Sequence, residues 1–99
     1  MIDEFEALEG CKLLLCHKPE HYMKRLRSRQ VDLTIAGHAH GGQIRIGQQG
    51  LYAPGQYFFP RYTKGWENGG KLLISAGAGN PCRMPRWNNP CEALLLTVD

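Results

Sequence analysis

Two histidines one residue apart, His38 and His40, are the side chains best suited to chemistry in this sequence. They directly follow the apolar run 33–36, and glycines flank them on both sides. In extended backbone, residues i and i+2 point to the same side, so both imidazoles can reach one polar pocket. Neutral imidazole is the commonest metal ligand among side chains. The pattern therefore indicates a metal site on a loop held by a strand.

All four histidines of the chain lie between positions 17 and 40, and His17 also follows an apolar run, 12–16. A single histidine is more often a hydrogen-bonded structural residue than a metal ligand. The spacing by itself leaves metal binding and a structural role open.

The elements that hold these histidines are predicted to be a strand, a helix and a second strand. The run Lys12–Cys16 is too short for a helix and predicts a buried strand. Pro19 suits the first turn of a helix that continues to Arg29, and Val31–Ala36 predicts the next strand. This order is typical of a β-α-β unit with parallel strands.

Beyond His40 the sequence predicts short strands and turns. Asn68-Gly69-Gly70 suits a tight hairpin turn because Asn and Gly tolerate positive φ. The predicted elements are a strand at 44–46, a turn at 47–50, a mostly irregular stretch at 51–64, a hairpin of 62–67 with 71–75, a polar loop at 77–90 and a buried strand at 93–98.

Composition indicates one small globular domain of 99 residues, whose charge is positive outside the first ten residues. The first ten residues form an acidic segment with charge −4, as one short helix or a frayed tail; the other 89 carry 12 basic and 5 acidic residues, +7. A basic body suits an anionic substrate, and equally weak nucleic-acid contact. No apolar run is long enough to span a bilayer, and no signal peptide begins the sequence, so a cytoplasmic or membrane-peripheral location is expected.

Four segments in order resemble the calcineurin-like metallophosphoesterase family. The segment 37–43, GHAHGGQ, is similar to that family's last signature block in one bacterial-type branch, and 13–20, LLLCHKPE, resembles the block before it. The segments 59–65 and 88–97 resemble closing segments of the same branch. The resemblance covers positions 12–98.

This resemblance implies an α/β fold: the C-terminal part of an αββα sandwich, in which helices flank two packed sheets. It also implies a site with two divalent metal ions (Mn, Fe, Zn or Ni), with His17 and His38 on one metal and His40 on the other. The family's first three blocks, D-x-H, G-D-x-x-D and G-N-H-[DE], do not occur here. Residues 1–99 are therefore expected to form a single partial domain that is inactive alone.

Substrate contacts are less well defined by the sequence. Gly41, Gly42 and Gln43 could offer backbone N–H groups to a phosphate, although a structural turn explains them equally well. Arg45 could contact the same phosphate, although an arginine on a strand is more often exposed to solvent and binds no ligand. His21, one helical turn past His17, has no counterpart in the resemblance and is expected at the surface.

The function expected from the resemblance is metal-dependent hydrolysis of a phosphodiester or pyrophosphate by a metal-activated water. One alternative is a truncated, non-catalytic domain that binds metal or a partner. A second is a basic nucleic-acid module built on the run 24–29, KRLRSR, although no nucleic-acid motif accompanies it. The expected partners are a phosphate-ester substrate and either a missing N-terminal half or a second copy, paired through exposed sheet edges.

Overall fold

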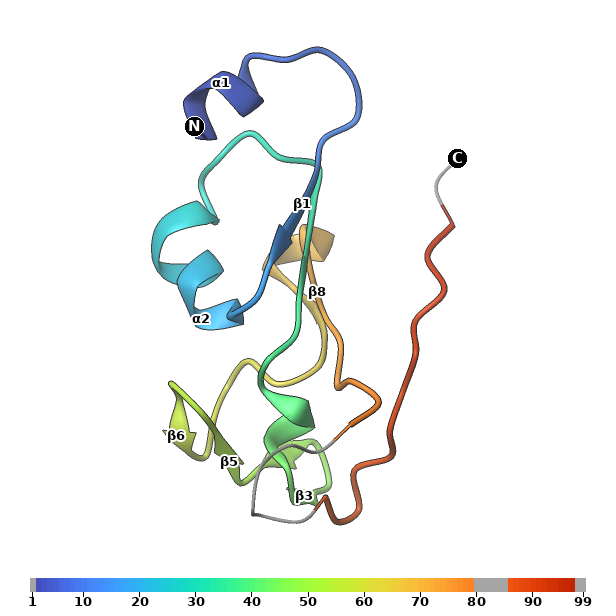
Figure 1. The fold of residues 1–99 in the computed structure, drawn as a ribbon. Helices are drawn as coiled ribbons and strands as arrows, with labels where there is room; N and C mark the ends of the chain where they lie inside the picture. The colour runs from blue at the N-terminus through green and yellow to red at the C-terminus, as the bar shows by residue number, and fades with distance from the viewer. Residues whose placement is uncertain (1, 80–85, 98–99) are drawn as a thin grey trace.

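A four-stranded sheet forms the centre of the computed structural model, which describes residues 2–79 and 86–97 (Figure 1). The strand order is β1-β2-β8-β7, where β1 is Leu13–Cys16, β2 is Leu33–Ala36, β8 is Leu72–Ile74 and β7 is Gly65–Glu67. The first three strands are parallel and β7 is antiparallel to β8. The chain is therefore a small mixed α/β domain, as its sequence predicts at that level.

The predicted β-α-β unit is confirmed. Strands β1 and β2 pair in parallel, with Leu13 opposite Leu33 and Cys16 opposite Ala36. The helix between them is shorter than predicted: α2 (Pro19–His21) passes into one π turn, η1 (Tyr22–Leu26), where the Arg27 N–H donates to the Tyr22 carbonyl. It does not continue to Arg29, whose side chain instead binds acidic residues of the N-terminal helix.

The core lies between this helical segment and one face of the sheet (Figure 1). Leu72 and Ile74 of β8 are fully buried beneath Tyr22, and Ala36 of β2 completes the cluster. Side chains alternate between faces along a strand, so these residues share one face of the sheet. Burial of this face holds strands β1 and β2 in place, and the candidate site lies at their carboxyl ends.

The opposite face of the sheet is largely open. Leu13 and Leu15 were expected to be buried, but both are exposed, because the described helical segment covers only the other face. The predicted buried strand at 93–98 is also wrong for its described part, 93–97, which is irregular and contains Leu95 at 96% exposure. This segment extends alongside the sheet without pairing with it (Figure 1). Position 98 lies outside the described residues.

Two short hairpins form a second group of strands beside the sheet. Strand β3 (Arg45–Ile46) pairs with β4 (Gln49–Gly50), and β5 (Tyr52–Ala53) pairs with β6 (Tyr57–Phe58). The β5–β6 hairpin falls in the stretch predicted to be irregular; its turn is made by residues 54–56, so Pro54 and Gly55 connect strands and do not prevent them.

The remaining turns largely follow the predictions. A single 3-10 turn, η3 (Asn68–Gly70), joins β7 and β8 in the expected hairpin. Another, η2 (His40–Gly42), begins at His40. Within the predicted loop 77–90, residues 77–79 and 86–90 contain no strand beyond an isolated bridge from Trp87 to Ile44, and 80–85 lie outside the described residues. Among the described residues no helix is long and apolar enough to cross a membrane.

The acidic N-terminal segment forms a short helix, α1 (Ile2–Glu6), which contacts the loop before β2. The Glu6 carboxylate accepts hydrogen bonds from the Gln30 backbone N–H at 2.7 Å and from Arg29 at 2.8 Å. The Gln30 bond, followed by the Arg29 guanidinium, lowers the pKa of Glu6 below its ordinary value of 4.5.

Docking of α1 is therefore expected to be lost in acid. A lowered carboxyl pKa in the folded chain contributes stability above pH 4.5 that disappears as pH falls through the folded value. The Gln30 amide proton should shift in NMR spectra with a midpoint below 4.5, and Glu6→Gln should remove that titration. A midpoint at or above 4.5 would contradict the assignment.

Candidate functional site

The site centres on His17 and His38, at the carboxyl ends of two neighbouring parallel strands. His17 directly follows β1, and His38 lies two residues beyond the end of β2. The Gly37 N–H donates to the His17 carbonyl at 3.1 Å, which ties the two strand ends together. His17 Nε2 and His38 Nδ1 lie 2.8 Å apart, and the rings meet edge to face with centroids 4.5 Å apart.

The hydrogen bonds define which nitrogen of each ring carries the proton. The second His38 nitrogen, Nε2, lies 3.1 Å from the carbonyl oxygen of Pro54. A carbonyl can only accept, so Nε2 is the protonated nitrogen of His38. In the neutral ring Nδ1 then carries a lone pair, and it accepts from the Nε2–H of His17. The two nitrogens thus point at one another, in the arrangement that a shared ligand would use.

Electrostatics favour the neutral form of His38. Partial burial lowers its pKa below 6.5, and the electrostatic effects of neighbouring His17 and Lys18 act in the same direction. Glu20 and the bond to Pro54 oppose the shift. A neutral imidazole is the form that binds metals, so His38 has a lone pair to offer near neutral pH.

His40 does not join this pair. Its position was predicted from extended backbone, but His38 has φ 68° and His40 has φ 48°, so both lie in the left-handed region. The two side chains therefore do not share a side in the way a strand would impose. Across residues 2–79 and 86–97, no three His, Cys, Asp or Glu side chains gather closely enough to hold a metal ion.

Asn89 holds the loop that follows the histidines; it lies in the closing segment 88–97, where the sequence predicts packing and hydrogen bonding. Its buried Nδ2 donates to the carbonyl of His40 at 2.6 Å and to that of Gln43 at 2.9 Å. The packing is tight enough to require glycine at Gly41, where an added Cβ would lie 2.3 Å from Asn89 Oδ1. The sequence signal for Asn89 was its place in the segment 88–97, which resembles a closing segment of the metallophosphoesterase family.

Arg45, considered above as a substrate contact, holds the same loop. Its guanidinium is buried, at 7% exposure, and donates to the Gly41 carbonyl at 2.8 Å, to Thr63 Oγ1 at 2.9 Å and to the Gln48 carbonyl at 2.7 Å. Burial lowers its pKa from the ordinary arginine value. These bonds give Arg45 a structural role in shaping the histidine loop.

The backbone N–H groups of the glycine-rich loop are also largely used within the loop. The Gly42 N–H donates to Ala39 and the Gln43 N–H donates to His40. Gln43 is fully buried, and its side-chain amide has no hydrogen-bond partner among the described residues. Of the two interpretations of Gly41, Gly42 and Gln43, this arrangement favours a structural turn over a phosphate cradle.

Glu20 is a buried carboxylate that sequence reasoning did not single out. It is only 9% exposed, and neither oxygen receives a hydrogen bond from the described residues. It lies against Gly55, where an added Cβ would be 2.4 Å from Glu20 Oε1. Its negative charge opposes the net lowering of the His38 pKa. Its place at the end of the segment 13–20, LLLCHKPE, which resembles a metallophosphoesterase block, was the signal that could have identified it.

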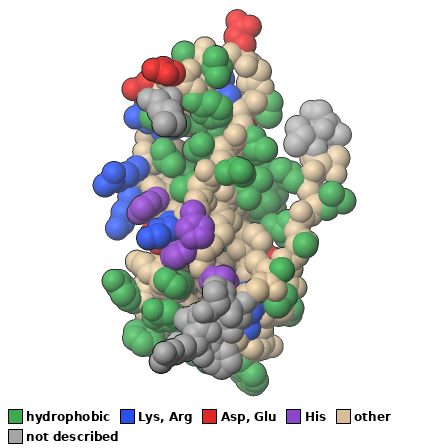
Figure 2. Space-filling model, viewed as in Figure 1, with side chains coloured by type: hydrophobic (Ala, Val, Ile, Leu, Met, Phe, Trp, Pro, Cys, Tyr) green, Lys and Arg blue, Asp and Glu red, His purple; other side chains and the backbone are tan. Residues whose placement is uncertain are grey.

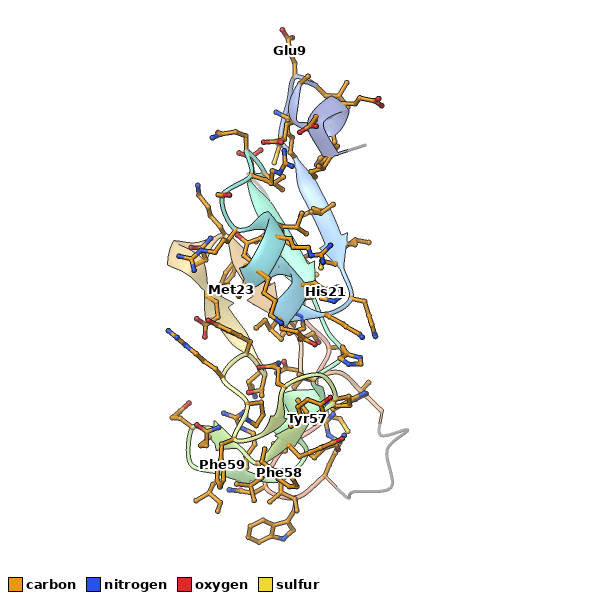
Figure 3. The ribbon with its side chains drawn as sticks, turned by 90° about the vertical axis from the view of Figure 1, so that its left-hand side faces the viewer. Glu9, His21, Met23, Tyr57, Phe58 and Phe59 are labelled. Carbon is orange, nitrogen blue, oxygen red and sulfur yellow. The ribbon has the colours of Figure 1, made fainter. Side chains whose placement is uncertain are left out.

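His21 is exposed on α2, as expected (Figure 3). It is not among the hydrogen-bond partners of the His17–His38 pair. Figure 2 shows histidine side chains gathered on one face with basic side chains beside them.

Removing the Asn89 side chain is expected to loosen the histidine loop. Asn89→Ala would leave two carbonyls without their donor, and we expect a loss of about 2–3 kcal/mol in unfolding free energy. The exposed neighbour Asn88 has φ 54° and donates one bond of 3.1 Å to the Arg45 carbonyl. Asn88→Gly removes that bond and leaves the left-handed backbone unstrained, so it is the control and should cost only about 1 kcal/mol. Urea unfolding of both variants makes the comparison. Equal losses would contradict the role given to Asn89.

Comparison with known proteins gives one relative of unassigned function. The chain is 41% identical over 86 residues to the uncharacterized protein YpbG of Bacillus subtilis. The match covers 87% of this chain and spans 30% of the length of that curated relative. No family model matches the chain, and no solved structure matches it.

Proposed function

We propose that this chain is the C-terminal portion of a metal-dependent phosphoesterase and contributes histidine ligands to its two-metal centre. The observation that carries the proposal is the His17–His38 pair, with Nε2 and Nδ1 2.8 Å apart at the ends of adjacent parallel strands. Ligands commonly bind at this edge of an open α/β sheet. The ordered segments that resemble metallophosphoesterases support the same conclusion.

The paired nitrogens suit a shared metal with a small adjustment. Two imidazole nitrogens at 2.0–2.1 Å from a tetrahedral ion lie about 3.3 Å apart, so the pair would open by roughly half an ångström. To bind the ion, His17 would carry its proton on Nδ1 in place of Nε2, which would free the Nε2 lone pair. His38 would keep its Nε2–H on the Pro54 carbonyl, the kind of outer contact that orients a metal-binding histidine.

In the proposed centre the metals would supply an activated water and stabilise charge on the phosphoryl oxygens. His17 and His38 would hold one ion, and His40 would face the second. Asn89 and Arg45 would fix the loop that carries His40. The bridging carboxylate and the remaining ligands would come from sequence outside these 99 residues, which is compatible with the greater length of the Bacillus relative. The αββα sandwich belongs to this proposal, with its second sheet against the open face of β1 and β2.

The test is manganese-dependent hydrolysis of an aryl phosphodiester, by this chain and by a version extended upstream in its gene. We expect no activity from the 99 residues and activity from the extended protein that His38→Ala and His40→Ala each abolish. Activity of the 99-residue chain would overturn the proposal that these residues hold only part of the metal site. An extended protein that binds manganese but never hydrolyses the ester would indicate the non-catalytic, metal-binding alternative.

A further inference from the structure

Three consecutive aromatic residues, Tyr57, Phe58 and Phe59, project from one end of the molecule; we call them the aromatic turn. Their exposed fractions are 68%, 69% and 72%. Figure 3 shows them gathered at the end opposite Glu9, beyond the four-stranded sheet. Large apolar side chains that gather at the surface commonly mark an interaction site.

Tyr57 and Phe58 of the aromatic turn form strand β6, and the β5–β6 hairpin holds the turn in place. The Phe59 N–H donates to the Leu51 carbonyl at 3.0 Å, and the Phe58 ring meets Tyr52 edge to face at 5.6 Å. Gln56 exchanges two hydrogen bonds with the Tyr62 backbone, at 2.7 and 2.9 Å. The backbone is thus fixed while the rings stay exposed, so the hairpin presents them outward.

The backbone at the turn adopts an unusual conformation for bulky residues. Tyr57 has φ 60° and Phe59 has φ 53°, a region that side chains of this size rarely occupy. Such strain persists only where surrounding structure imposes it. The strained backbone of Tyr57 and Phe59 therefore leaves both of their rings exposed to solvent.

The charge around the turn is positive. Residues 33–66 contain three basic residues and no Asp or Glu. All three, Arg45, Arg61 and Lys64, line a cavity of about 490 Å³ in which Glu67 is the single acidic lining residue. Arg45 is buried and its guanidinium donates within the protein, so the charge at the surface comes from Arg61 and Lys64. Lys64 is partly compensated by Glu92 at 3.5 Å, whereas exposed Arg61 lies over the Tyr62 ring.

We propose that the aromatic turn docks on the surface of an anionic phospholipid bilayer. Aromatic rings are favoured at the level of lipid headgroups, and basic residues beside them are attracted to acidic lipids. A projecting turn with exposed rings at its tip and exposed Arg61 behind it suits a fluid interface, which needs no matching pocket. The exposed charge of Arg61, two residues beyond Phe59 in a stretch without acidic residues, favours anionic over neutral lipid. Docking here requires no metal.

The experiment is flotation of the intact chain with vesicles of phosphatidylcholine and phosphatidylglycerol, 1:1, in a density gradient. Aggregated protein stays at the bottom, so self-association does not imitate binding. We expect the chain to float with these vesicles and much less with pure phosphatidylcholine, and the bound fraction to fall as salt is raised. Failure of the folded chain to float with anionic vesicles would overturn the proposal.

Matched variants locate the surface. Phe58→Ser with Phe59→Ser should weaken vesicle binding at least tenfold, and Arg61→Gln should reduce the preference for anionic lipid. Leu94→Ser with Leu95→Ser removes two exposed apolar side chains elsewhere and should bind within twofold of the parent chain. Equal binding by the two double variants, with unchanged circular dichroism, would also overturn the proposal. His38→Ala should float like the parent, which separates this result from the phosphoesterase proposal.

Discussion

Replacing His38 with alanine is expected to weaken Zn²⁺ binding by the chain at least tenfold. His38 Nδ1 and His17 Nε2 are the paired donor atoms of the candidate site, and loss of even an outer contact at metal sites typically costs about 10–100-fold in affinity. Zn²⁺ is the better probe for this partial site because it binds nitrogen donors more tightly than Mn²⁺. Isothermal titration calorimetry gives the affinity.

The matched control for this prediction is His21→Ala. His21 is exposed on the same β-α-β unit but outside the pair, so its loss should leave the affinity unchanged. NMR of the imidazole nitrogens provides a second measurement: Zn²⁺ should shift Nε2 of His17 and Nδ1 of His38, while Nε2 of His38 remains protonated. Unchanged affinity in His38→Ala, or an equal loss in His21→Ala, would remove the basis for placing a metal between the two strands.

Replacing Gly42 with alanine is expected to destabilise the chain by about 3–5 kcal/mol, a sum of left-handed strain and overpacking. Gly42 has φ 81°, and an added Cβ would lie 2.5 Å from the Gly50 Cα. The neighbour is backbone of strand β4, so no side-chain rotation relieves the contact. The histidine loop or the β3–β4 hairpin must move to accommodate the methyl group.

Gly47→Ala separates the cost of left-handed strain from the cost of overpacking. Gly47 also has a positive φ, of 59°, but nothing lies within 4 Å of an added Cβ. Its substitution should cost only the conformational strain, about 1–2 kcal/mol. Urea unfolding of both variants tests the difference, and Zn²⁺ titration of Gly42→Ala should show whether the His17–His38 pair is disturbed. Similar unfolding free energies for the two variants would show that the approach to Gly50 is unimportant.

Local sequence was sufficient for the central elements because each is specified by neighbouring residues. The apolar runs before His17 and His38 became parallel strands, and Asn68-Gly69-Gly70 made the predicted turn between β7 and β8. Local pattern failed for 93–97, where five residues of suitable composition for a strand pair with neither edge strand of the sheet, β1 or β7. A strand needs partner hydrogen bonds, which composition alone does not supply.

The sequence by itself determined that His17 and His38 lie together, since both follow strands of one β-α-β unit and parallel strands end at the same edge. Only the tertiary structure decided how the loop beyond them is held. Arg45 and Asn89 reach the carbonyls of Gly41 and His40, and Asn89 does so from nearly fifty residues away along the chain. His38 and His40 both have left-handed backbone, which separates their side chains, and the loop beyond them packs closely against Gly50. Spacing along the chain cannot encode such contacts, because they depend on which strands pair and which turns meet.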